Sequence, residues 1–147
     1  MMRFEYQKGV GLIEILVTLV VLAIGTLGLA GLQTQALKNN QSSLQRAQAV
    51  ALTYAAFDML RVNRKAATDG DYDMAMTCNP PSVTTSSTLV VRDKKYWIET
   101  LQTALGGTTC GAIDCDTNGY CTVKVQWNDE RATDGGSSQV LTTRSRL

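Results

Sequence analysis

The stretch from Val10 to Leu32 constrains the fold most, because Glu14 is the only ionisable side chain in this run of 23 residues. A helix needs about 20 predominantly apolar residues to cross the core of a bilayer, so the run predicts a membrane-spanning helix. A carboxylate within such a span costs about 2.5–3.5 kcal/mol on insertion scales, which points to a functional role for Glu14. Arg3 and Lys8 precede the run and predict that this end of the chain stays in the cytoplasm.

Simpler interpretations of the same stretch stay open. A secretory signal peptide has a shorter apolar segment, of about 7–15 residues, although Gly28-x-Ala30 offers a small-residue cleavage pattern. A plain signal-anchor has the right length but gives no reason to retain Glu14. If Glu14 lies only one turn into the span, its carboxylate can also sit at the level of the lipid headgroups.

The totals narrow the class of protein. The chain has 147 residues, with 14 Lys and Arg against 13 Asp and Glu, so nothing indicates a nucleic acid as partner. It has no histidine, which excludes Ser-His and Cys-His nucleophile pairs and the commonest zinc ligation. The sequence therefore argues against an enzyme.

The four cysteines all follow the apolar run, at Cys78, Cys110, Cys115 and Cys121. Their spacing lacks the paired C-x-x-C arrangement of structural zinc sites, and an even count in a small exported domain favours two disulfides. Four cysteines allow three connectivities. We favour Cys78–Cys110 with Cys115–Cys121, since the second pair closes one short loop; free buried thiols would require a reducing compartment.

A helical pattern continues beyond the apolar run to about Arg64 without a proline, so we expect one continuous helix from Val10 to Arg64. Its last part, from Ala49 to Val62, is apolar around most of its circumference and should be covered by a domain on most sides. Within the first part, Gly25, Gly28 and Gly31 each weaken the helix by about 1 kcal/mol relative to alanine in water. We take this to be a segment that can partly unwind when the chain leaves the bilayer.

The residues after this helix predict a small head of mixed structure. Residues 66–88 are typical of a loop, Leu89–Val91 of a short strand, and Gly111–Tyr120 of a turn-rich connection. Asp93 is expected to cap a helix that runs to about Leu105 and buries Trp97. The clearest strand is Tyr120–Trp127, where apolar and polar residues alternate; a polar loop and a returning strand, Gln139–Arg144, follow.

An incomplete calcium motif lies within the head. Asp114, Asp116 and Asn118 place oxygens at alternate positions before Gly119, as at the start of an EF-hand loop. Val125 stands where the bidentate glutamate belongs, so a plain turn is favoured and calcium is kept as the alternative. No other cofactor is expected.

The first residues of the apolar run also carry a family resemblance. Lys8-Gly9-Val10-Gly11-Leu12-Ile13-Glu14, followed by a long apolar helix, resembles the class III signal of type IV pilins and pseudopilins. The continuation Leu27-Gly28-Leu29-Ala30-Gly31-Leu32-Gln33 is similar to the minor pilins of the PilV family, the type IV pilus modification proteins. Val10 replaces the phenylalanine of major pilins, and Gly11 replaces the usual serine or threonine.

The resemblance implies a processing and assembly mechanism. A prepilin peptidase would cleave between Gly9 and Val10, the new Val10 amine would be methylated, and Glu14 would meet the amine of a subunit already assembled. The implied fold is α+β and pilin-like, with one long N-terminal helix, transmembrane in its first half, packed against a small antiparallel sheet domain. Its parts would be a leader (1–9), a membrane and assembly half (10–32), a periplasmic half (33–64) and a disulfide-containing head (65–147).

The implied function is that of a minor pilin that helps to initiate pilus assembly. The partners would be other minor pilins, the major pilin, the prepilin peptidase and the assembly platform of the bacterial inner membrane. The head would lie in the periplasm, and at the cell surface after assembly. Two alternatives remain: a pseudopilin of type II secretion, and a signal-anchored periplasmic binding domain.

Overall fold

The computed structural model describes residue 9 and residues 11–133 and 135–147. The chain divides into two compact units, Met1–Leu37 and Lys38–Leu147. We call the second unit the head.

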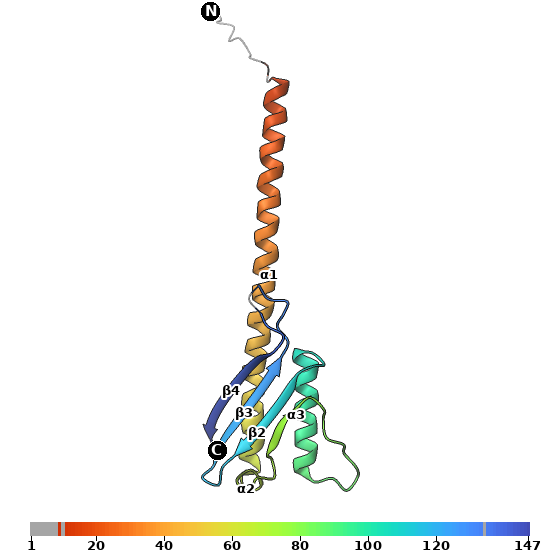
Figure 1. Cartoon of the computed structure of the whole chain (residues 1–147), viewed down its shortest axis with the longest axis vertical. Helices are drawn as coiled ribbons and strands as arrows, with labels where there is room; N and C mark the ends of the chain where they lie inside the picture. Colours follow the sequence, from red (N-terminus) through yellow and green to blue (C-terminus); the bar gives the residue numbers. More distant parts are fainter. Residues whose placement is uncertain (1–8, 10, 134) are drawn as a thin grey trace, which may run out of the picture. The chain divides into compact units, whose positions relative to one another are not determined.

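Helix α1, Leu12–Val62, contributes to both units and is 51 residues long (Figure 1). It begins where the carbonyl of Gly11 accepts hydrogen bonds from the N–H groups of Glu14 and Ile15, at 3.0 and 3.3 Å. The predicted long helix is therefore confirmed, with a break near its end. Asn63 has a non-helical backbone, with φ −119° and ψ 51°, and a separate short helix α2, Arg64–Thr68, follows.

In the first unit, all described side chains of α1 are exposed, and most of them are apolar. The threonine hydroxyls are satisfied by the helix itself. Thr18 donates to the carbonyl of Ile15 at 2.8 Å, and Thr26 donates to that of Ala23 at 2.9 Å. Such internal bonds remove the need for water at these hydroxyls, which suits a helix in lipid.

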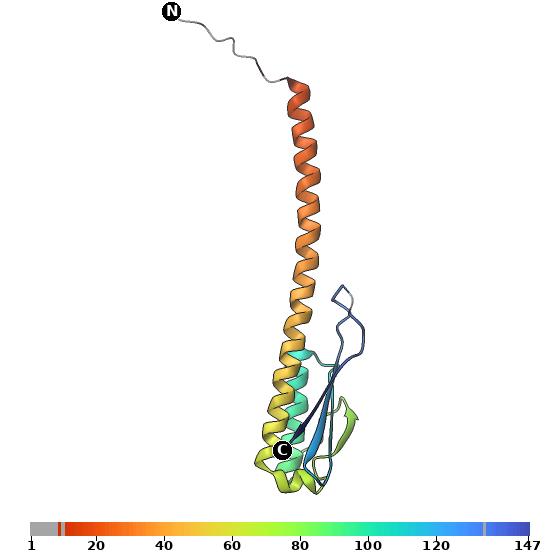
Figure 2. The ribbon, with the colours of Figure 1, turned by 90° about the vertical axis from the view of Figure 1, so that its left-hand side faces the viewer.

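The head is built on a four-stranded antiparallel sheet in the order β1-β2-β3-β4. Its strands are β1 (Met74–Thr77), β2 (Cys110–Cys115), β3 (Tyr120–Trp127) and β4 (Gln139–Arg146), and helix α3 (Leu89–Leu105) connects β1 to β2. Figure 2 shows α3 and the last part of α1 on the same side of the sheet. The predicted α+β class, a long helix packed against a small antiparallel sheet, is confirmed.

The core of the head lies between these helices and one face of the sheet. The alternation predicted for β3 is present, since Cys121, Val123, Val125 and Trp127 are buried. The largest side chains that meet them are Phe57 and Leu60 of α1, Ile98 and Leu101 of α3, and Tyr72. Trp97 also lies in this core, as predicted, and its indole N–H donates to the carbonyl of Leu52 at 3.0 Å.

The head covers α1 on one side only, so the expectation of a helix buried on most sides is wrong. Ala49, Thr53 and Ala56 are buried, as are Phe57 and Leu60, whereas other apolar residues of the same stretch face outward. Those outward residues, which we call the α1 strip, are Val50, Ala51, Tyr54, Ala55 and Val62. The expectation failed because it assumed that one chain must cover the whole helix.

Two strands lie in stretches expected to be irregular. Strand β1 lies within the predicted 66–88 loop, and β2 replaces much of the predicted Gly111–Tyr120 turn. Gly111 looked like a turn residue, but a Cβ there would lie 2.6 Å from Trp97 Cζ3. This position therefore has a glycine because α3 approaches the backbone of β2 closely.

The start of α3 also differs from the prediction. Leu89–Val91 forms the first turn of α3 rather than a strand, and Thr88, in extended conformation, precedes the helix in place of Asp93. Val90 packs partly against the core, so the helical face that contains Trp97 begins one turn earlier than expected. The returning strand predicted for Gln139–Arg144 is confirmed as β4, which extends to Arg146.

Candidate functional site

The start of α1 carries the predicted assembly residues. Gly9 is exposed and lies outside any helix or strand, whereas Val10 and the leader residues 1–8 fall outside the described residues. Cleavage between Gly9 and Val10, and methylation of Val10, therefore stay predictions. Glu14 is the third residue of α1 and is exposed.

The surroundings of Glu14 are apolar. Leu12, Ile13 and Ile15 beside it are more than half exposed, and no basic side chain forms an ion pair with Glu14 among residues 9, 11–133 and 135–147. A carboxylate in the first turn of a helix is stabilised by the free N–H groups and dipole there. The geometry leaves this carboxylate available to a cation that the rest of the described chain does not supply.

The apolar stretch around Glu14 meets the requirements for a membrane span by length and composition. The most apolar 18-residue window of α1 has a mean hydropathy of 2.5, and none of it is buried within the chain. A core helix of a soluble protein would have such a window mostly covered. This segment fits a membrane anchor.

The cysteines are joined in two disulfides, Cys78–Cys110 and Cys115–Cys121. This is the connectivity favoured from the sequence. The first disulfide connects the end of β1 to the start of β2, across a sequence separation of 32. The second joins residues that face each other on β2 and β3, and it closes their hairpin.

The residues of the incomplete calcium motif form this hairpin and its turn. Asp116 Oδ1 accepts hydrogen bonds from the N–H groups of Asn118 and Tyr120, both at 2.9 Å. Gly119 has φ 83°, a conformation that side chains disfavour. Asp114 lies on β2, and in the described part of the chain no three His, Cys, Asp or Glu side chains are grouped to hold a metal. The favoured turn is therefore present, and it already uses one carboxylate oxygen of Asp116.

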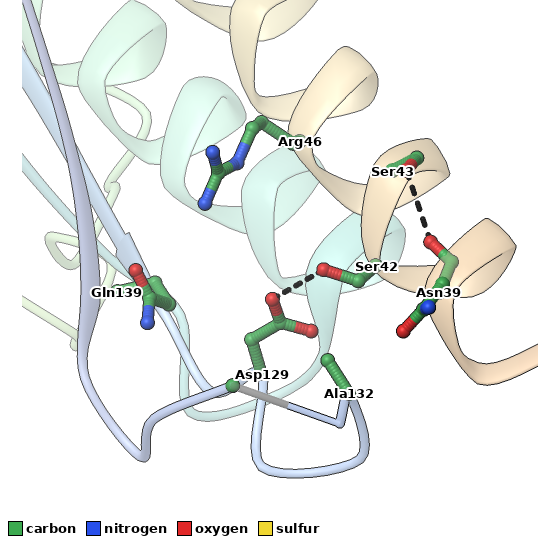
Figure 3. A pocket seen from close by; sticks show the side chains of 8 residues that line it. Asn39, Ser42, Ser43, Arg46, Asp129, Ala132 and Gln139 are labelled. Atoms are coloured by element: carbon green, nitrogen blue, oxygen red, sulfur yellow. Dashed lines mark hydrogen bonds between the residues drawn. The ribbon is translucent and has the colours of Figure 1, made fainter. Parts of the chain in front are cut away.

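A polar pocket of about 340 Å³ lies between α1 and the β3–β4 loop of the head (Figure 3). Asp129, which is 4% exposed, accepts a hydrogen bond from the Ser42 hydroxyl at 2.5 Å. Thr133 of the same loop donates to Asn39 Oδ1 at 3.0 Å. Arg46 also lines the pocket, without an ion pair to Asp129 in the described structure. These contacts hold the loop against α1.

A second polar cluster joins the connection between α2 and β1 to helix α3. The Tyr72 hydroxyl donates to Asp93 Oδ2 at 2.6 Å, and the buried position of the ring, with this hydrogen bond, raises the pKa of Tyr72 to about 12. Lys94 Nζ donates to the carbonyls of Asp71 and Asp73, at 2.5 and 3.0 Å. Burial lowers the pKa of Lys94, against the effect of both aspartates.

Sequence reasoning missed these two polar clusters for a simple reason. Ser42 and Asp129 are 87 residues apart, and Tyr72 and Asp93 are 21 apart. No local spacing signals such pairs, because only the fold brings them together. The N-terminal motif, in contrast, is contiguous and can be recognised in the sequence.

Comparison with known proteins agrees with that motif. The family model described as the prokaryotic N-terminal methylation motif matches residues 6–30. No curated protein and no solved structure matches the chain. The match indicates a type IV pilin-like or pseudopilin protein, processed by prepilin peptidase in a pilus or pseudopilus assembly context. The family with this motif is structural rather than catalytic.

Proposed function

We propose that this protein is a minor pilin of a type IV pilus, similar to the PilV family, and that it helps to initiate pilus assembly. The observation that carries the proposal is the exposed apolar half of α1, which begins at the methylation motif and contains one carboxylate, Glu14. An apolar helix with no cover from its own chain needs lipid before assembly and other helices afterwards.

The proposed mechanism is assembly. The peptidase cuts after Gly9 and frees an amine on Val10, which is then methylated. Glu14 pairs with the corresponding amine of a neighbouring subunit, because an opposite charge nearby offsets the cost of an ionised carboxylate in an apolar medium. The α1 strip gives the head a further apolar surface for neighbouring helices. The disulfides support a head that lies in the periplasm and later at the cell surface.

A type II secretion pseudopilin is the second candidate, because it would use the same N-terminal chemistry. The segment Gly25–Gly31 with Leu32 and Gln33 after it favours the pilus protein by its resemblance to the PilV family. The two candidates differ in where the mature chain is found. A pilus subunit is recovered in sheared pili, whereas loss of a pseudopilin blocks secretion.

The test combines an N-terminal mass with one substitution. Protein from its own cells should lack residues 1–9 and carry a methyl group on Val10. Glu14→Gln should be processed normally but incorporated into sheared pili at least about tenfold less, which corresponds to about 1.4 kcal/mol.

A matched control is Glu99→Gln on α3, which removes an exposed acid that pairs with Lys95 at 3.5 Å. This variant should be incorporated into pili as efficiently as the protein without a substitution. An intact leader, cleavage near Ala30, or normal incorporation of Glu14→Gln would contradict the proposal.

A further inference from the structure

The two edges of the sheet differ in how they are protected. Strand β1 has four residues, its register with β2 shifts between Met74 and Thr77, and the disulfide of Cys78 follows directly. Strand β4 has eight residues, and each of them has a partner on β3 without a register shift. Short length and irregular register protect a sheet edge from further pairing. The edge at β4 has neither, and no proline or glycine interrupts it.

Four residues of β4 direct their backbone groups toward the open side of this edge. The N–H of Leu147 donates to the carbonyl of Gly119 at 2.9 Å, which fixes which residues bond to β3. Since antiparallel partners alternate, the odd-numbered residues of β4 bond to β3. The N–H and C=O groups that face outward belong to Val140, Thr142, Arg144 and Arg146. Figure 1 shows β4 at the rim of the sheet, and within the described chain its only partner strand is β3.

The charges that could guard this edge are turned away from it. The guanidinium groups of Arg144 and Arg146 lie over the Tyr120 ring of β3, at 5.1 and 5.6 Å from its centroid. Arg144 also reaches Asp116 at 3.5 Å. Charged side chains protect an edge by projecting along it. Here they lie across the neighbouring strand, so the backbone groups of β4 stay accessible.

The face of the sheet that carries these arginines has basic side chains near the β4 edge, whereas its acidic residues, Asp114 and Asp116, lie farther from that edge, on β2 and directly after it. Lys124 lies on β3 opposite Thr142, and neither Lys124 nor Arg146 forms an ion pair in the described part of the chain. Residues on an added strand would lie about 4.5–5.5 Å from their partners on β4, close enough for opposite charges to stabilise the pair. An acidic side chain opposite Arg146 would therefore be favoured, whereas Arg144 already has Asp116 as a partner.

We propose that the β4 edge binds an extended, acidic segment of another protein, which adds a fifth strand to the sheet. Backbone hydrogen bonds to the four outward residues provide the affinity. Arg146, which has no carboxylate partner in the described part of the chain, selects acidic side chains by turning from the Tyr120 ring toward them. A second copy of this chain fits less well, because its β4 strand has no acidic side chain to place opposite Arg146. This surface lies on the head and does not depend on the assembly role of Glu14.

The experiment uses the full-length mature protein in detergent micelles and two synthetic peptide probes. One peptide alternates threonine and aspartate over eight residues, and the other has lysine in place of each aspartate. The acidic peptide should slow amide exchange at Val140, Thr142, Arg144 and Arg146 at least tenfold. The lysine peptide should leave these amides unchanged, and the inward amides of β4 should not respond to either peptide.

Two variants at one position separate backbone pairing from side-chain effects. Thr142→Pro removes an outward N–H that β3 does not use, and should weaken binding of the acidic peptide at least tenfold. Thr142→Val retains the N–H and should bind normally. Arg146→Glu, which leaves the backbone intact, should reverse the preference between the two peptides.

Three outcomes would overturn the proposal. One is no protection of the four amides with the acidic peptide at millimolar concentration. Another is equal binding by Thr142→Pro and Thr142→Val. The third is self-association of the protein that protects these amides without any peptide, which would identify a second copy as the occupant.

Discussion

The two units of the chain treat apolar side chains in opposite ways. In the unit Met1–Leu37, the apolar side chains of α1 are exposed and make no core. In the head, Lys38–Leu147, a core of buried side chains is closed by two disulfides. The comparison teaches that one helix can be covered by its own chain in one part and left without cover in another. The head carries its own stability, whereas the first unit depends on what surrounds it.

Removal of the Cys78–Cys110 disulfide should have the largest effect on the head. Replacing both residues by alanine should lower the free energy of unfolding by about 3.7 kcal/mol, because the disulfide closes a long loop in the unfolded chain. The matched pair Cys115→Ala with Cys121→Ala should cost about 2.2 kcal/mol, since that loop is shorter. Urea unfolding followed by tryptophan fluorescence measures both, because Trp97 and Trp127 lie in the head. Equal losses would show that loop length does not determine the stabilisation.

The stability of the head should depend on pH through the ionisation of the buried Tyr72. Its pKa is raised from 10.0 to about 12 in the folded head, so the unfolded chain loses this proton first as pH rises. The free energy of unfolding should fall as pH rises from 10 to 12, by up to about 3 kcal/mol. Tyr72→Phe should lack this loss of stability. Subtracting its free energy of unfolding from that of the unsubstituted protein at each pH removes the contribution of the lysines, which both proteins share. A constant difference from pH 8 to 12 would contradict the raised pKa.

Glycine-to-alanine substitutions should separate tight packing from open surface within the head. Gly111→Ala places a methyl group 2.6 Å from Trp97 and 2.9 Å from Ile98, so it should destabilise the head by about 1–3 kcal/mol. Gly107→Ala meets nothing within 4 Å and should change stability by less than about 0.5 kcal/mol. Thermal unfolding compares the two variants. A neutral Gly111→Ala would mean that α3 can move away from β2 without loss.

A glycine-to-alanine substitution in the first unit should have the smallest effect, and it should stabilise the helix rather than destabilise the protein. At Gly28 nothing lies within 4 Å of the position that an alanine methyl group would take, and alanine favours a helix over glycine by about 1 kcal/mol in water. Gly28→Ala should therefore slow amide exchange between Gly25 and Gly31 in micelles and leave unfolding of the head unchanged. A shift in the unfolding of the head would contradict the separation of the two units. Full protection of this segment in assembled pili would contradict the idea that it unwinds.

The features that could be predicted are those with a local signal. The apolar run fixed the position of α1, strict alternation identified β3, and the periodicity around Trp97 identified most of α3. Asp116 and Gly119 have turn chemistry that is also local. These signals depend on neighbours in the sequence, which is why they held in the structure.

The features that were missed depend on contacts between distant residues. Strand β2 contains Gly111 and Asp114, residues that usually favour turns, and it is a strand because β1 and β3 pair with it on both sides. The buried Asp129 is held by Ser42, which no spacing reveals. The uncovered side of α1 was missed because composition shows that a surface is apolar without showing what covers it.

The connection between β1 and β2 has a consequence for the order of events during folding. Strands β2, β3 and β4 follow one another along the chain and can pair as hairpins, whereas β1 must close a loop that contains all of α3. Hairpins form in about 1–10 µs, and contacts across long loops come later because more chain entropy is lost. We expect β1 to join the sheet last, so Cys78 would be the last cysteine to meet its partner. A delay in oxidation would then leave a head whose three longer strands are formed while its fourth strand is still unattached.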